Sequence, residues 1–204
     1  MSPQRPFIGR VLAGGLTWLG RRRLAQTSGT LSLPGLTASV EIIRDRWGVP
    51  HIYAANDHDV FFAQGFVHAQ DRLWQMGLNR RLATGRLSEM LGDLALYTDR
   101  ATRTFGFERL GRADWELLPA EDRQRIEAYC AGINAWLDRP AGKRCRPLEL
   151  PLLRHRPQPW RVQDTLALSR LTAGNDNSLL DAANAIATVV RAFRRSGGEA
   201  RREQ

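Results

Sequence analysis

His68 and Asp71 lie three positions apart within a stretch whose apolar residues recur at helical spacing, so both side chains should share one helix face. Imidazole nitrogens and carboxylate oxygens bind zinc, and this pair could begin a metal site. A zinc site needs three or four ligands, however, and no His-x-x-x-His pattern completes it. The sequence therefore favours a hydrogen-bonded polar network on a packed helix over a metal site.

His51 follows Pro50 and could serve in proton transfer, and Asp45 follows Arg44 in a segment rich in turn formers. For both residues we expect a fixed position in a turn, with Asp45 pairing locally or capping the turn. A further charged set surrounds the predicted helix pair, and we expect it to form a solvated face or intersubunit salt bridges. It comprises Arg72, Arg80, Arg81, Arg86 and Glu89.

Two cysteines, Cys130 and Cys145, are too few for a disulfide framework, and no Cys-x-x-Cys occurs. We expect Cys130 to be a buried apolar residue, and a disulfide between the two in an exported protein is the alternative. The sequence also contains no Gly-x-Gly-x-x-Gly, no phosphate-binding loop and no Gly-x-Ser-x-Gly. Nucleotide-dependent and serine-esterase chemistry therefore lack support.

The elements that would position these residues begin with a β-branched strand at 40–44, a turn and a second extended piece at 51–53. Asn56 then supplies helix-capping chemistry for a long helix over 57–84 with two adjacent apolar stripes. A shorter helix is predicted around 87–91, and Pro119 opens another that reaches Leu137. The remaining expectations are a loop over 139–159 and helices over 162–171 and 179–193.

Gly132 lies within the predicted helix that ends near Leu137. A helical glycine costs about 1 kcal/mol relative to alanine, so its presence indicates a close backbone contact at that point.

The chain of 204 residues carries a net charge of +9, and the excess sits at its two ends. Residues 1–39 hold five Arg and no acid, and residues 191–204 hold five Arg against two Glu. The body between them is close to neutral, which argues against a basic helical nucleic-acid binder, because such proteins carry the charge on folded elements.

Residues 1–28 form a basic and apolar leader, with an apolar run at 11–19 followed by three consecutive arginines. That length suits a weak signal or a membrane-associated segment, since a spanning helix needs about 20 apolar residues. The residues after the run are three arginines rather than a small-x-small cleavage site, and a leader without function is the alternative.

Six segments, in this order and spacing, resemble the start of the penicillin acylase (penicillin amidase) family. They are RDRWGVPHI from Arg44, AQGFVHAQDRLWQM from Ala63, RRLATGRLSEMLG from Arg80, YCAGINAW from Tyr129, PLEL from Pro147 and PQPWRVQD from Pro157. The resemblance covers about 29–184. It implies an α+β protein with the four-layer αββα N-terminal nucleophile hydrolase fold, of which this chain supplies a mostly helical portion and an N-terminal strand. We place the acylase-like α-chain region at 29–190 and a basic polar tail at 191–204.

The resemblance also implies a two-chain enzyme, made when a precursor cuts itself and exposes an N-terminal Ser on a β chain. The free α-amine, with a pKa of roughly 7.7 to 8.0, can take the proton from its own hydroxyl as the Ser attacks an amide carbonyl. No serine of this chain stands in a Ser-Asn segment like the one that opens the β chain. The resemblance therefore assigns no catalytic residue to this chain.

Site residues in the α chain are implied by position within the family. Ala173 and Asn177 fall near positions that line the acyl-binding pocket. Asp181, followed three positions later by Asn184, falls where the family has an acidic ligand of a structural calcium shared with the β chain. This chain departs from the family there by a two-residue gap and by Asp in place of Glu. A first-turn helix acid is the alternative for Asp181.

The function implied is the α-chain part of a hydrolase that cleaves the side-chain amide of β-lactams or N-acyl homoserine lactones. Its partners would be a β chain and a small-molecule amide substrate, and its location the periplasm or cell envelope, with the cytoplasm as the alternative. The rival hypothesis is a non-catalytic remnant, or a helical interaction module that needs a separate β chain. If the chain is a severed subunit, Phe62, Phe66 and Trp74 should face a surface that the β chain covers.

Overall fold

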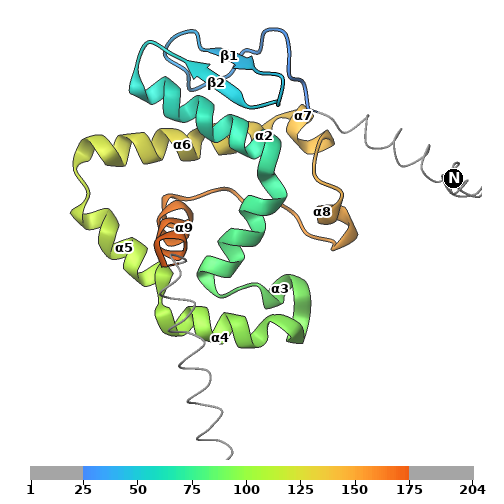
Figure 1. Ribbon diagram of the computed structural model, residues 1–204, viewed down its shortest axis with the longest axis vertical. Helices are drawn as coiled ribbons and strands as arrows, with labels where there is room; N and C mark the ends of the chain where they lie inside the picture. The colour runs from blue at the N-terminus through green and yellow to red at the C-terminus, as the bar shows by residue number, and fades with distance from the viewer. Residues whose placement is uncertain (1–24, 175–204) are drawn as a thin grey trace, which may run out of the picture. The chain divides into compact units, whose positions relative to one another are not determined.

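The computed structural model describes residues 25–174, which are mostly helical with one two-stranded sheet (Figure 1). In chain order the elements are β1 (Glu41–Arg44), β2 (Pro50–Tyr53), α2 (Asp57–Thr84), α3 (Ser88–Leu91), the 3₁₀ helix η1 (Gly92–Ala95), α4 (Leu96–Phe105), α5 (Phe107–Leu117), α6 (Ala120–Asp138), α7 (Pro140–Arg144), α8 (Glu149–Leu152) and α9 (Val162–Gly174). Two compact units divide the chain. Unit 1 contains the chain up to Leu78 and Pro119–Val162, and unit 2 contains Asn79–Leu118 and the chain from Gln163.

Strands β1 and β2 form an antiparallel hairpin in unit 1, with Ile42 opposite Ile52. The turn is fixed by Asp45, whose carboxylate accepts hydrogen bonds from the backbone N–H groups of Trp47 and Val49 at 2.8 and 3.0 Å. Gly48 has φ +78°, which a side chain would strain. The predicted strand, turn and second extended piece are confirmed.

Helix α2 has the predicted bounds and the predicted cap. The Asn56 side-chain oxygen accepts a 2.8 Å hydrogen bond from the backbone N–H of Asp59, the pairing expected of a helix N-cap. Arg72, with φ −132° and ψ 20°, interrupts the helical conformation, so α2 is two helical stretches joined at a kink.

The core of unit 1 forms where α2 meets α6, and glycines allow their backbones to touch. A Cβ added at Gly132 would overlap the carbonyl oxygen of Phe62, and one added at Gly65 would overlap that of Tyr129. The close contact predicted at Gly132 is therefore confirmed. Trp136 packs edge-on against Phe66, with ring centroids 5.4 Å apart.

Phe62 and Phe66 are 1% and 3% exposed, since the Phe62 ring lies against Gly35 and the Phe66 ring packs against Trp136 of α6. The expectation that they face a surface awaiting a β chain was wrong for both, and Trp74 is half-buried. The core that these phenylalanines form is internal to the chain.

Unit 2 is organised around α4, α5 and α9. Gly111 of α5 lies against Leu166 and Ala167 of α9, where an added Cβ would come within 3.0 Å of both. The Asp99 carboxylate of α4 accepts hydrogen bonds from the backbone N–H groups of Leu87 and Ser88 at 2.7 and 2.8 Å. Asp99 thereby caps the start of α3, which has no side-chain cap of its own.

Several helices differ from the sequence predictions. The segment 95–109, which carries few strong signals, forms η1, α4 and the start of α5, and the predicted loop at 139–159 contains α7 and α8. Pro140 stands at the first turn of α7, where its missing N–H costs nothing. The predicted helix at 179–193, the leader up to residue 24 and the tail at 191–204 lie outside the described residues, and the predicted region boundaries stay predictions. Within residues 25–174, no helix is long and apolar enough to cross a membrane.

Candidate functional site

Asp59, in the first turn of α2, is the centre of a buried polar network in unit 1. Its carboxylate is fully buried and accepts hydrogen bonds from the backbone N–H and hydroxyl of Thr37, the backbone N–H of Ala38 and the side-chain amide of Asn56, all within 2.7–2.9 Å. His58 Nδ1 lies 3.1 Å away. Burial raises the pKa of this carboxyl, but the hydrogen bonds outweigh burial and hold it well below its usual range. Asp59 therefore fastens residues 37 and 38 to α2 as a carboxylate that is ionised near neutral pH.

The helical pair His68 and Asp71 does not converge on a common point. His68 Nδ1 lies 2.9 Å from the Tyr129 hydroxyl of α6, whereas Asp71 forms a two-point ion pair with Arg44 of β1 at 2.8 and 2.9 Å. Arg44 also donates to the Gln70 side-chain oxygen at 2.9 Å. The predicted polar network is confirmed, and it fastens α2 to both β1 and α6.

Burial shifts the pKa values of the His68 and Tyr129 pair in opposite directions. Desolvation lowers the pKa of His68 by more than the charge of Asp71 raises it. Desolvation also raises the pKa of Tyr129 to about 12. Both groups are therefore neutral near pH 7. The two rings pack edge to face with their centroids 5.7 Å apart, so the pair is a packing contact that also contains a hydrogen bond.

His51 and Asp45 lie together in the hairpin, with His51 Nε2 at 3.4 Å from the Asp45 carboxylate. Desolvation raises the pKa of Asp45, but the hydrogen bonds from Val49, Trp47 and His51 outweigh it and lower the pKa. The predicted role of Asp45 in fixing the turn is confirmed.

The arginines near the end of α2 are more buried than predicted. Arg80 and Arg81 are 9% and 8% exposed, so these two do not belong to a solvated face. Arg80 lies 3.4 Å from the buried carboxylate of Asp164 in α9, and Glu89 pairs with Arg86 at 2.7 Å. The correction has a physical reason: the stems of Arg80 and Arg81 are packed inside unit 2, where Asp164 offsets part of the charge.

In the described part of the chain, no group of three His, Cys, Asp or Glu side chains lies close enough together to hold a metal ion. Cys130 is buried, as predicted, and both it and Cys145 are free thiols rather than a disulfide.

Of the residues implied by family position, Ala173 lies in the last turn of α9, where it is exposed. Asn177, Asp181 and Asn184 lie outside the described residues. The assignments of Ala173 and Asn177 to a pocket and of Asp181 to calcium therefore stay predictions.

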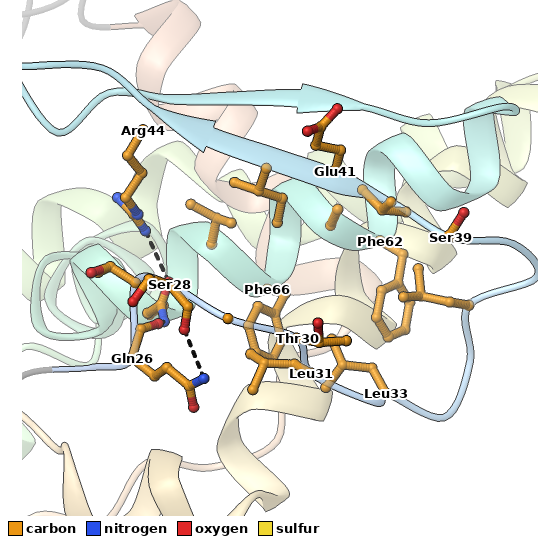
Figure 2. A pocket seen from close by; sticks show the side chains of 18 of the residues that line it. Gln26, Ser28, Thr30, Leu31, Leu33, Ser39, Glu41, Arg44, Phe62 and Phe66 are labelled. Carbon is orange, nitrogen blue, oxygen red and sulfur yellow. Dashed lines mark hydrogen bonds between the residues drawn. The ribbon is translucent and has the colours of Figure 1, made fainter.

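A groove of about 670 Å³ opens between β1, the first half of α2 and the irregular segment 25–38, hereafter the arm. Figure 2 shows Phe62 and Phe66 beneath β1, with Leu31 and Leu33 of the arm beside them. Arg44 stands at one end of the groove and Ser39 at the other. Sequence reasoning missed both the groove and Asp59, because each depends on contacts between the arm and α2, which no local pattern signals.

The framework of unit 1 is thus a hairpin and a kinked helix that a second helix crosses backbone to backbone at glycines. The family model described as penicillin amidase matches residues 39–202, and the chain belongs to that family.

Two curated relatives illustrate the range of names within the family. The chain is 46% identical over 147 residues to penicillin acylase 2 proenzyme of Pseudomonas sp. (strain SE83), covering 72% of this chain and 19% of that protein. It is 38% identical over 157 residues to acyl-homoserine lactone acylase QuiP of Pseudomonas aeruginosa, covering 76% of this chain and 18% of the relative. The chain thus spans about a fifth of the length of these relatives.

Among solved structures, a thermostable penicillin G acylase from Alcaligenes faecalis superposes with a TM-score of 0.60 at 28% sequence identity. The match covers 69% of this chain and 75% of that chain. The fold expected from the resemblance, a mostly helical part of an N-terminal nucleophile hydrolase with a short sheet, is therefore confirmed.

Proposed function

We propose that this chain is the α-chain region of an acylase that hydrolyses a side-chain amide, and that it acts together with a β chain. The observation that carries the proposal is the match to the penicillin amidase family over residues 39–202, in a chain that spans about a fifth of its relatives. Under this proposal the β chain supplies the nucleophilic Ser, its free amine and the oxyanion hole. The chain contributes a framework that holds part of the acyl pocket.

The substrate class follows from the names of the relatives, which are penicillin acylases and acyl-homoserine lactone acylases. The names describe acylases of penicillin in one case and of acyl-homoserine lactones in the other. We propose the same reaction here, with β-lactams and N-acyl homoserine lactones as candidate substrates.

Reconstitution tests this function. This chain is produced together with the remainder of the Pseudomonas sp. SE83 proenzyme, and the pair is assayed on a penicillin, an N-acyl homoserine lactone and a chromogenic acyl anilide. Amide hydrolysis by the pair and none by either part alone is the expected result. The matched control replaces the nucleophilic Ser of the other part by Ala, and it should assemble without activity.

The non-catalytic alternative gives a different result in the same assay. A helical interaction module would assemble with the partner and leave all three amides intact. Failure to assemble at all would contradict both the acylase and the interaction module, and it would favour the remnant.

Ala173 is proposed to line the acyl pocket together with Asn177. Ala173 is exposed at the end of α9, where it can meet a ligand without rearrangement of the core of unit 2. Ala173→Leu should change the preference of the reconstituted enzyme between short and long acyl chains. Ser169→Leu, one turn earlier on α9 and also exposed, is the matched control.

Asp181 is proposed as one ligand of a structural calcium that the β chain completes. Calcium takes about six to eight oxygen ligands, so a single carboxylate binds it only as part of a shared site. Calorimetry on the reconstituted pair should show calcium binding that Asp181→Asn weakens. Binding that persists unchanged in the variant would remove Asp181 from the site.

The periplasm or cell envelope is proposed as the location, on the basis of the arginine-flanked apolar run at 11–19. A fusion of residues 1–28 to a reporter that is active only after export tests it. A reporter that stays inactive would favour the cytoplasm.

A further inference from the structure

A strongly basic segment follows α6 in unit 1. Residues 139–161, hereafter the basic segment, contain seven Lys or Arg and a single acid, Glu149. The basic segment includes α7 and α8 and ends just before α9. The near-neutral average of the chain body therefore hides one local concentration of positive charge.

Four cations of the basic segment are not neutralised by the chain itself. Within residues 25–174, Lys143, Arg144, Arg154 and Arg156 occupy exposed positions and form no ion pair. Arg125 of α6, by contrast, lies between three carboxylates that it contacts at 2.7–3.1 Å. The basic segment therefore presents its charge to whatever lies outside unit 1.

Arg154 carries its charge at a position that its backbone disfavours. Its φ is +54°, a left-handed conformation that glycine adopts freely and that strains other residues. It lies in the turn that ends α8, where the His155 backbone N–H donates to the Leu150 carbonyl at 2.8 Å. Glycine is the usual residue at such a helix end. An arginine there argues for a role of its side chain.

Exposed leucines accompany these cations. Leu152 is 81% exposed, Leu148 is 41% exposed and Leu153 is 37% exposed, and all three belong to α8 or flank it. A surface for single-stranded nucleic acid would instead present aromatic rings on which bases stack. The single Trp, Tyr or Phe of the basic segment is Trp160, which is buried. Cations around exposed leucines are typical of surfaces that lie on lipid headgroups.

The basic segment also lies beside the arm, which the leader precedes. Arg139, at the start of α7, donates to the Ser32 carbonyl at 3.4 Å, and Figure 1 shows the arm reaching α7. Ser32 follows the basic and apolar leader by only a few residues. The leader therefore meets the described chain close to the basic segment.

We propose that residues 139–156 bind the surface of a bilayer that contains anionic phospholipids. The exposed cations would contact the headgroup phosphates, and Leu152 would insert between the headgroups. Each Lys or Arg near an anionic surface strengthens binding about fivefold, and the apolar area that leaves water adds to this. The inference goes beyond the proposed amide hydrolysis and does not depend on it.

Vesicle sedimentation with the full chain tests the inference. The chain should bind vesicles that contain phosphatidylglycerol, should ignore vesicles of phosphatidylcholine alone, and should be released by salt. Chloride and inorganic phosphate at equal ionic strength should release it equally. A much stronger effect of phosphate would assign the cations to a site for free phosphate and would overturn the inference.

Substitutions at exposed positions test which residues bind. The triple variant Lys143→Gln, Arg154→Gln and Arg156→Gln should bind the anionic vesicles about 100-fold more weakly, because three charges are lost. Leu152→Ser should weaken binding about tenfold, because less apolar area leaves water. Circular dichroism verifies that each variant is folded.

A control variant removes the same number of charges from α4 and α5 of unit 2. It combines Arg100→Gln, Arg109→Gln and Arg112→Gln, all at exposed positions. It should change binding about twofold at most, because salt screens charges that do not touch the membrane. Equal losses in the two triple variants would show that binding follows net charge alone and would overturn the inference.

Hydrogen exchange locates the contact. Anionic vesicles should protect the backbone amides of residues 148–156 and leave those of α4 unchanged. Vesicle binding that the first triple variant retains in full would assign the contact to the leader and overturn the inference. Tighter binding to duplex DNA than to anionic vesicles at the same salt would make the surface a nucleic-acid interface and would also overturn it.

The reconstituted pair separates this inference from the proposed function. Vesicle binding that persists in the pair supports the inference, whether or not the pair hydrolyses amides. Binding by the lone chain that disappears on assembly would show that the partner covers the basic segment, and it would overturn the inference. Amide hydrolysis by the same pair would leave the proposed function standing.

Discussion

Thr37 and Asp59 are joined by two hydrogen bonds, from the backbone N–H at 2.9 Å and from the hydroxyl at 2.7 Å, although they lie far apart in sequence. This contact holds the end of the arm against the first turn of α2. It therefore links the groove wall to the helix that carries the groove floor.

Replacement of Asp59 by Asn should destabilise the chain strongly. The amide cannot accept all the hydrogen bonds that the buried carboxylate accepts, so one or more donors would be left unsatisfied. We expect a loss of about 3 kcal/mol in the free energy of unfolding, measured by urea denaturation. Asp138→Asn, at an exposed position of α6, is the control and should change stability by less than about 0.5 kcal/mol.

Stability should fall in acid because Asp59 and Asp99 both have lowered pKa values in the folded chain. Desolvation raises the pKa of Asp99 too, and the hydrogen bonds from Ser88 and Leu87 outweigh it. The unfolded chain therefore binds protons first as the pH falls, so the contribution is complete above the ordinary value of 3.8 and is lost progressively below it. Urea titrations across this range should show a shallower pH dependence in Asp59→Asn than in the parent chain. An identical dependence in both would contradict the assignment.

Gly132→Ala should disrupt the contact between α2 and α6. The added Cβ would overlap the Phe62 carbonyl oxygen, and neither backbone can move without opening the core. Although alanine has a helix propensity about 1 kcal/mol better than glycine, we expect a net loss of roughly 3 kcal/mol in stability. Thermal unfolding followed by circular dichroism measures this change. Gln124→Ala, on an exposed turn of the same helix, should be neutral or mildly stabilising, and a similar gain in Gly132→Ala would show that the helices are not in contact.

Tyr129 should titrate later than an ordinary phenol, since burial raises its pKa to about 12. Ultraviolet absorbance of the folded chain should therefore contain a late phenolate transition that Tyr129→Phe removes. Tyr97→Phe, at a 61% exposed position, should leave that transition in place. The titration is read only over the pH range in which circular dichroism shows the chain to be folded.

Asp164→Asn should destabilise unit 2, because the Asp164 carboxylate is 2% exposed and offsets the buried charge of Arg80. Removal of one member of a buried ion pair costs about 3–5 kcal/mol, since the other charge stays buried. Chemical denaturation should show this loss. Asp93→Asn, an exposed acid of η1, is the control, and an equal effect of the two variants would exclude a special role for Asp164.

The parts of the fold that local chemistry determines could be predicted from the sequence. The hairpin turn follows from Asp45 and Gly48, the start of α2 from Asn56, and the backbone contact at Gly132 from a glycine inside a helical pattern. The turn and the helix start depend on residues that are neighbours along the chain. The contact at Gly132 is indicated by the free-energy cost of a glycine within a helix, which the sequence also reveals.

The parts that were missed depend on distant partners. Asp59 looks like an ordinary first-turn acid, and only the fold brings Thr37 to it. Arg80 looks like a surface residue until Asp164 meets it inside unit 2. Helix α4 lacks a side-chain cap, so its start carries no local signal, although Asp99 within it is an anchor of unit 2.

Helices α2 and α6, which cross at Gly65 and Gly132, leave the ribosome at different times. Ribosomes add about 5–20 residues per second, so α6 is synthesised several seconds after α2. During that interval Phe66, which is 3% exposed in the finished fold, lacks the Trp136 ring of α6 against which it packs. We therefore expect the nascent chain to expose Phe66, and to benefit from a holdase chaperone, until Trp136 has left the ribosome.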